Sequence, residues 1–187
     1  MIGVMGVDIG PTMLRSDLLH LRPIQERDLD ALYRQLNTLE HRGSYFPMGL
    51  QAEPVFRRRF EETGFWSKDE GMLLMVNAQG QIVGEIEYFP VTDYLTGFEL
   101  SYLIFGAEHH GKGYATEAVR LMSQYLFAQH RIERLQLNIH PENTASRRVA
   151  EKAGYSLEGV MRRAWFNGGR FHDLEIWSIL RDEQQIP

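Results

Sequence analysis

The chain has 187 residues, of which 43% are hydrophobic and 24% are charged, with a formal net charge of −5 and no cysteine. These values are typical of one globular domain and exclude a disordered or fibrous chain. The absence of cysteine excludes disulfide frameworks, thiolate zinc sites and cysteine nucleophiles. The acidic balance argues against a nucleic-acid partner and favours a cationic one.

No apolar run reaches the roughly 20 residues that a membrane-spanning helix needs. Residues 1–13 lack the basic beginning of a secretory signal. We therefore expect a cytoplasmic protein with no membrane partner. Residues 1–14 are expected to be a loose extension, and residues 15–187 to form a single domain.

The hydrophobic pattern predicts alternating strands and helices along the chain. Strands are expected at 18–22, 72–76, 82–89, 98–105, 135–139, 156–166 and 171–180, and helices from Asp28 to Leu36 and at 54–62, 113–129 and 145–152. The three strands between 72 and 105 read as an antiparallel meander, and the last two strands as a hairpin around 167–169. The fold class is α/β (α+β), with a mixed, mostly antiparallel sheet flanked by helices.

A glycine-rich loop lies between the strand ending at Phe105 and the helix beginning near Gly113. Backbone N–H groups at a helix N-terminus bind phosphate or pyrophosphate, and Gly111 and Gly113 allow close approach. A Walker A loop is excluded because Lys112 is followed by glycine, and Thr116 stands where a dinucleotide fingerprint needs its third glycine. A helix-starting turn without a ligand stays open as an alternative.

Two motifs carry a resemblance to a known family. Residues 110–115 (HGKGYA) resemble motif A of the GNAT superfamily of N-acetyltransferases, with His110 in place of its first Gln or Arg. Residues 143–155 (NTASRRVAEKAGY) are similar to a pattern of the ribosomal-protein N-terminal acetyltransferases, the RimJ/RimL branch. The segments 19–23 (LHLRP) and 28–30 (DLD) resemble the same branch.

The resemblance implies acetyl-CoA as cosubstrate and a GNAT-like twisted sheet whose central strand pair splays apart. The pantetheine arm is expected to pair with the backbone in this gap, and the pyrophosphate to bind amides at the start of the following helix. Arg147, Arg148 and Lys152 are candidates for the 3′-phosphate or are solvated helix charges. The implied cofactor residues are Leu103, Ile104, Phe105, His110, Gly111, Lys112, Gly113, Tyr114, Ala115, Thr116, Asn143 and Arg148.

Glu99 and Ser146 are the candidate catalytic residues. Glu99 lies where some GNAT members carry a catalytic glutamate, and partial burial would raise its pKa towards the working pH. Its alternative is a solvent-facing or arginine-paired side chain. The tyrosine that many members use as an acid corresponds to Ala150, so the resemblance makes the Ser146 hydroxyl the substitute donor to sulfur. A plain helix-surface serine is the alternative.

Tyr45, Phe46 and Glu85 are the candidate substrate residues. The two aromatic residues lie on the loop before the second helix, and the carboxylate of Glu85, like that of Glu87, suits a cationic substrate. The two aromatic residues could instead belong to the core, and the two glutamates could equally be ordinary solvent-facing strand residues. No metal is expected, because His109 and His110 have no further ligand at metal-binding spacing.

The sequence therefore predicts an N-acetyltransferase that moves an acetyl group from acetyl-CoA to a primary amine, either a protein N-terminus or a small molecule. The alternative is a non-catalytic acyl-CoA-binding module of the same fold. A ribosome- or RNA-associated protein is disfavoured by the acidic balance. We expect a monomer or a homodimer.

Overall fold

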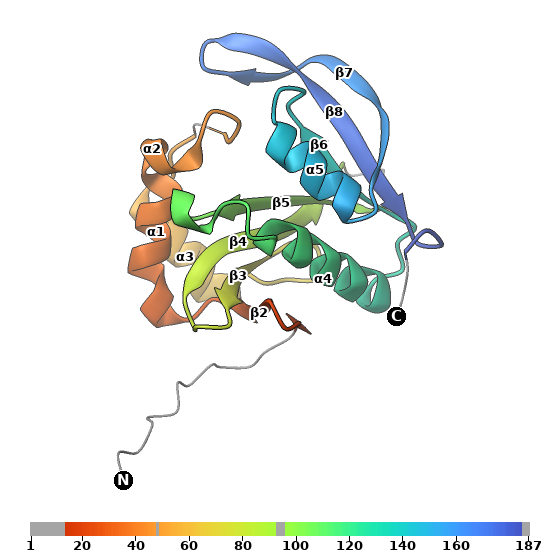
Figure 1. Cartoon of the computed structure of the whole chain (residues 1–187). Coiled ribbons are helices and arrows are strands. Elements are labelled where there is room, and N and C mark those ends of the chain that lie inside the picture. Colours follow the sequence, from red (N-terminus) through yellow and green to blue (C-terminus); the bar gives the residue numbers. More distant parts are fainter. Residues whose placement is uncertain (1–13, 48, 93–95, 185–187) are drawn as a thin grey trace.

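The computed structural model of the chain describes residues 14–47, 49–92 and 96–184. Eight strands form one sheet in the order β1-β2-β3-β4-β5-β6-β8-β7, and all neighbours are antiparallel except β5 and β6 (Figure 1). The strands are β1 (Leu14–Arg15), β2 (Leu19–Pro23), β3 (Gly71–Asn77), β4 (Ile82–Pro90), β5 (Phe98–Ile104), β6 (Arg134–Ile139), β7 (Ser156–Asn167) and β8 (Arg170–Leu180). The mixed, mostly antiparallel sheet confirms the predicted fold class.

Helices cover both faces of the sheet (Figure 1). They are α1 (Leu29–Asn37), α2 (Leu39–Arg42), α3 (Glu53–Thr63), α4 (Tyr114–Gln129) and α5 (Thr144–Lys152), with short 3-10 turns at Glu26–Asp28 and Ala107–His109. Side chains alternate across a strand. Leu73 and Met75 accordingly pack in the core that includes α4 and α5, whereas Met72 and Leu74 pack in the core that includes α1 and α3.

The predicted strands and helices are confirmed, with ends that differ by a single residue. The strand β1 and the helix α2 were not predicted, because each is too short to show a period. Residues 1–13 of the predicted extension lie outside the described residues, whereas Leu14 pairs with Leu21 in the sheet. The single domain over residues 15–187 stays a prediction.

A buried ion pair joins β2 to the start of α1. Arg22 donates from Nη1 and Nη2 to Asp28 at 2.6 and 2.8 Å, and the Gln25 N–H donates to the same carboxylate at 2.8 Å. Burial alone would raise the pKa of Asp28, but these hydrogen bonds outweigh it and lower the pKa. The Arg22-Pro23 and Asp28 signature in the sequence therefore has a structural role.

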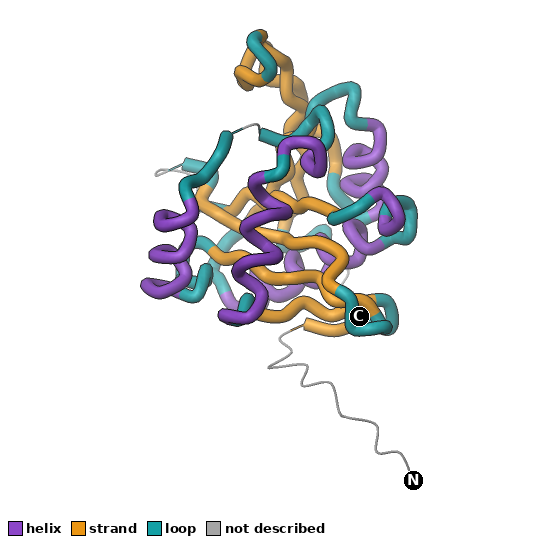
Figure 2. The backbone as a smooth tube through the Cα atoms, turned by 90° about the vertical axis from the view of Figure 1, so that its left-hand side faces the viewer, coloured by secondary structure: helices purple, strands orange, loops and turns teal. Residues whose placement is uncertain are grey.

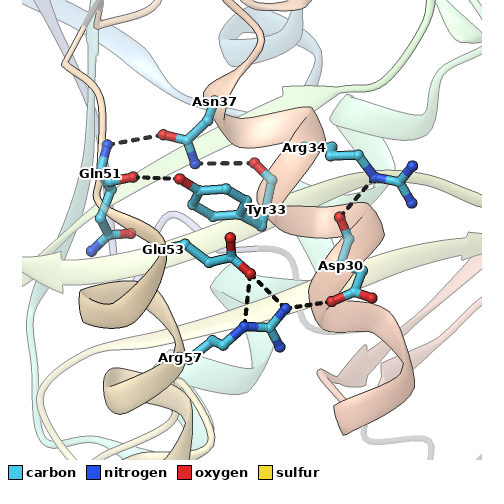
Figure 3. A network of polar contacts seen from close by, with 7 residues as sticks. All are labelled: Asp30, Tyr33, Arg34, Asn37, Gln51, Glu53 and Arg57. Carbon is cyan, nitrogen blue, oxygen red and sulfur yellow. Dashed lines mark hydrogen bonds and ion pairs between the residues drawn. The ribbon is translucent and has the colours of Figure 1, made fainter.

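Hydrogen bonds to α1 hold the segment between α2 and α3 in place (Figure 3). The Tyr33 hydroxyl donates to the Gln51 carbonyl at 3.1 Å, and the Gln51 N–H donates to the Asn37 side chain at 2.9 Å. Arg57 of α3 donates to Asp30 of α1 at 2.5 Å. These contacts fix the segment that forms one wall of the site described below.

The sheet parts in its middle. Strands β5 and β6 pair only at Phe98 with Leu135 and at Glu99 with Gln136, and residues 100–104 have no partner on β6. On its other edge β6 pairs with β8 along its whole length, and the long β7–β8 hairpin projects above the body of the molecule (Figure 2). The predicted splayed strand pair is confirmed.

Candidate active site

A cavity of about 1080 Å³ lies at this gap and is lined from both faces of the sheet. Glu85, Glu87 and Glu99 line it on the face that carries α1 and α3, while Tyr102 and Ser146 line it on the face that carries α4 and α5. Small-ligand pockets usually measure roughly 300–1,000 Å³. The volume of this cavity lies just above that range.

The first face presents buried carboxylates. Glu85 is 1% exposed, and its Oε2 has no hydrogen-bond partner among the described residues. Burial raises the pKa of Glu85 well above its ordinary value, and the charge of Glu87 raises it further. Burial also raises the pKa of Glu87, against the charge of Arg59, which is itself paired with Glu70 at 3.3 Å. Burial therefore disfavours the charged forms of both carboxyls.

Glu99 stands at the edge of the gap. The side-chain amide of Asn138 on β6 donates to its Oε2 at 2.7 Å. Burial raises the pKa of Glu99 to about 7, a hydrogen bond from Gln136 opposes this rise, and the charge of Glu87 adds to it. A carboxyl with this pKa can take up a proton near neutral pH, which is what a general base requires.

The loop after α2 closes the carboxylate side. Arg42 donates from Nη1 to the carbonyls of Pro47 and Gly49 at 2.7 and 2.6 Å. The ring of Tyr45 lies 4.9 Å from the ring of His140, at the end of β6. Tyr45 and Phe46 both line the cavity, as predicted for substrate residues, and their role stays a prediction.

On the opposite face a hydroxyl pair bridges β5 and α5. Tyr102 donates to Ser146 Oγ at 3.0 Å, and Asn143 caps α5 by accepting the Ser146 N–H at 3.1 Å. Burial raises the pKa of Tyr102 to about 12, against the smaller effect of its bond with Ser146. Ala150 is fully buried and offers no polar group.

The glycine loop leads into α4 on this same face. Gly111 and Gly113 have φ of 72° and 86°, a region that glycine enters without strain. Gly113 is the N-cap of α4 and no side chain caps the first turn, so its N–H groups are available to an anion. Lys112 and His110 are exposed beside it.

The predicted site residues fall into two groups. Those that line the cavity are Tyr45, Phe46, Glu85, Glu99, Leu103, Ile104, His110, Asn143 and Ser146. Those outside its lining are Phe105, Gly111, Lys112, Gly113, Tyr114, Ala115, Thr116 and Arg148. Arg148 is exposed, and Arg147 lies 3.1 Å from Glu175.

The expectation that the Phe105 backbone is free for a cofactor is wrong, because its N–H donates to the Val83 carbonyl at 2.9 Å. Backbone groups alternate sides along an antiparallel ladder. The groups of Leu103 therefore also face β4, and those of Tyr102 and Ile104 face the gap. The sequence analysis did not identify Tyr102 and Asn138 as site residues. Each gains its place in the site from a hydrogen bond to a residue far away in the sequence, Ser146 or Glu99.

None of the described helices combines the length and the apolar character that crossing a membrane requires. Within residues 14–47, 49–92 and 96–184, no three His, Asp or Glu side chains gather as a metal site would need. The cytoplasmic location and the monomeric or homodimeric state stay predictions.

The family model of the Acetyltransferase (GNAT) domain matches residues 19–156. The chain belongs to the GNAT acetyltransferase family. The predicted family, fold and acetyl-CoA-dependent N-acetyl transfer are thereby confirmed.

Two relatives from Bacillus subtilis (strain 168) support this membership. The chain is 38% identical to the probable N-acetyltransferase YjcK over 77 residues, which span 41% of this chain and 42% of that relative. It is 27% identical to an SPbeta prophage-derived uncharacterized N-acetyltransferase, YokL, over 94% of this chain and 97% of the relative.

Solved structures share the fold. Spermidine N-acetyltransferase from Vibrio cholerae, in complex with CoA and spermine, is 21% identical and superposes with a TM-score of 0.77 over 90% of this chain and 99% of that chain. The ribosomal α-N-protein acetyltransferase RimL, in complex with coenzyme A, is 18% identical with a TM-score of 0.78 over 92% and 99%. At these identities the likeness concerns the fold alone.

Proposed function

We propose that this GNAT acetyltransferase acetylates a small amine with more than one cationic group, inside the gap between β5 and β6. The acceptor enters from the carboxylate face, and acetyl-CoA enters from the face that carries α4 and α5. The observation that carries the proposal is the cavity itself, which is lined by carboxylates on one face of the sheet and by hydroxyls on the other.

The unpaired backbone groups of β5 and α4 support the placement of the cofactor. The pantetheine arm pairs with the unpartnered edge of β5 like an added strand. The pyrophosphate binds the uncapped first turn of α4 after Gly113. Asn143, at the N-terminus of α5, lines the same cavity and contacts the cofactor there. The thioester then lies in the gap between Glu99 and Ser146.

The amine attacks the thioester carbonyl directly. An alkylammonium has a pKa near about 10.4 and must lose a proton before it becomes a nucleophile. That first proton is released to solvent, which leaves a neutral amine. Glu99 takes a second proton from the nitrogen, directly or through a water molecule, as the nitrogen–carbon bond forms. The carbon–sulfur bond then breaks and its electron pair leaves on the sulfur of coenzyme A, which accepts a hydrogen bond from the Ser146 hydroxyl.

The class of acceptor follows from the carboxylate wall. Phe89 is the β4 residue opposite Glu99, and Glu87 and Glu85 lie two and four residues before it. An amine at Glu99 therefore leaves both carboxyls free for a second cationic group. A buried carboxylate without a partner is costly unless a cation joins it. This favours a polyamine, such as the spermidine of the Vibrio relative's name, over the protein N-terminus of the ribosomal-protein enzymes.

A panel of acceptors tests the proposal. Release of coenzyme A from acetyl-CoA is followed with spermidine, with a monoamine of matched length and with a peptide that begins with alanine. We expect the highest kcat/KM for spermidine, and a Glu85→Gln variant that loses this preference while its rate on the monoamine changes little. Preference for the peptide would overturn the acceptor class.

The alternative of a non-catalytic acyl-CoA-binding module rests on one observation, the buried alanine at position 150. Calorimetric binding of acetyl-CoA without turnover of any amine in the panel would favour this module. Turnover with any acceptor would exclude it.

A further inference from the structure

A tyrosine on β5 lies beside Ser146, the proposed hydrogen-bond donor to the thiolate of coenzyme A. We infer that Tyr102 is a positioning residue that aims the hydroxyl proton of Ser146 at the sulfur of coenzyme A. The inference rests on the proposed function and adds a residue to it. Tyr102 donates to Ser146 Oγ at 3.0 Å, and both side chains line the cavity.

The direction of the hydrogen bond is what gives Tyr102 its role. A hydroxyl has one proton to donate, and the Ser146 oxygen is already an acceptor for Tyr102. Burial raises the pKa of Tyr102 to about 12, so its phenol keeps its proton at neutral pH and stays the donor. The Ser146 proton must therefore point away from Tyr102.

A second serine shows the arrangement that Ser146 lacks. Ser123, inside α4, donates to the Val119 carbonyl one turn earlier at 2.7 Å, as helical serines commonly do. Ser146 lies in the first turn of α5 and makes no such bond to a described residue. Its proton remains available for a ligand in the cavity.

The chemical step stays balanced without a covalent role for Tyr102. The amine nitrogen bonds to the acetyl carbon, the carbon–sulfur bond breaks, and the proton from nitrogen goes to Glu99. The charge that develops on sulfur is met by the Ser146 O–H, a donor fixed in advance by Tyr102. Ala150 offers no hydroxyl on the next turn of α5 that could do this instead.

Kinetics of paired variants test the inference. We expect Tyr102→Phe to lower kcat about tenfold, since it disorders a donor without removing it, and Ser146→Ala to lower kcat somewhat more. The KM for acetyl-CoA should change little in both. The double variant should match Ser146→Ala alone, because Tyr102 acts through Ser146. Ser146→Thr, which keeps the hydroxyl, should retain most of the rate.

The chain contains a matched control. Tyr155 and Ser123 form a second buried hydroxyl pair at 2.8 Å, and neither lines the cavity. Tyr155→Phe should lower the melting temperature and leave kcat close to the wild-type value. An unchanged kcat in Tyr102→Phe, or losses that add in the double variant, would overturn the inference.

A binding measurement separates this inference from the proposed function. The chain has no cysteine, so a thiolate absorbance that appears on binding coenzyme A belongs to the cofactor. We expect the apparent pKa of the bound thiol to be higher in Tyr102→Phe and in Ser146→Ala than in the wild type. This readout needs no acceptor amine. Equal thiol pKa values in all three proteins would refute the role of Tyr102 even if acetyl transfer is observed.

Discussion

The side-chain amide of Asn138 donates to Oε2 of Glu99 across the gap, at 2.7 Å, beyond the last register pair of β5 and β6. The bond holds the carboxylate at the point where the strands separate. It also favours the charged form of Glu99, which opposes the effect of burial on the pKa.

Replacing Glu99 tests the base directly. Glu99→Gln should lower kcat/KM by about 10²- to 10⁴-fold, the usual contribution of a general base. Because burial raises the pKa of Glu99 to about 7, the wild-type rate should rise with pH through about 7 as the carboxylate forms. The variant should lack this limb of the profile. A Glu99→Gln enzyme with the wild-type pH–rate profile would remove Glu99 from the mechanism.

Replacing Asn138 tests its effect on that carboxylate. Asn138→Leu removes a donor to the charged form, so the pKa of Glu99 should rise and the acid limb should move to higher pH. The rate on the high-pH plateau should fall much less than in Glu99→Gln. The measurement is kcat/KM from pH 5 to pH 9, at about half-unit steps. An unmoved limb would show that Asn138 does not influence the base.

The glycine loop is tested by adding charge where the pyrophosphate is expected. Gly113→Glu should weaken acetyl-CoA binding at least about tenfold, because it strains a left-handed position and repels an anion. Gly80→Glu is the control, since Gly80 also has positive φ and open space around it but lies in the β3–β4 turn. Titration calorimetry should find wild-type affinity in the control. Equal losses in both variants would contradict the assignment of the loop.

The buried carboxyl of Glu85 should make stability depend on pH. Its pKa is raised in the folded state, so the unfolded chain ionises first and wild-type stability falls as pH rises above the ordinary carboxyl range. Glu85→Gln does not titrate. The variant should therefore gain melting temperature relative to the wild type between about pH 5 and about pH 8, at roughly 2–4 °C per kcal/mol. A constant difference across this range would show that Glu85 is ionised in the fold.

The ion pair between Arg22 and Asp28 should matter for stability and not for chemistry. Asp28→Asn leaves a buried guanidinium without its counter-charge and should cost about 3–5 kcal/mol in urea denaturation. The pKa of Asp28 is lowered, so its stabilising effect is present at neutral pH and disappears as pH falls through the lowered pKa. Asp30→Asn, at an exposed pair with Arg57, should leave the midpoint near the wild-type value. Similar midpoints for both variants would contradict this account.

The sequence predicted what is local along the chain. Alternation and helical spacing located each longer strand and helix, and the Gly111–Gly113 loop and the Asn143–Tyr155 motif pointed to the cofactor. The partners of Glu99 and Ser146 could not be found this way. Asn138 and Tyr102 reach them from other strands, and that proximity depends on the sheet order and register. The same limit explains the error at Phe105, since which side of the strand its N–H faces is set by pairing with Val83.

The short junction of β5 with β6 has a mechanical consequence. Strands β1 to β5 form one half of the sheet and β6 to β8 the other, and within the described sheet two register pairs join the halves. A pantetheine arm in the gap would supply hydrogen bonds that β5 and β6 do not make to each other. Acetyl-CoA should therefore slow amide hydrogen exchange at the edges of β5 and β6 more than elsewhere. Without acetyl-CoA, local unfolding should begin between these two strands.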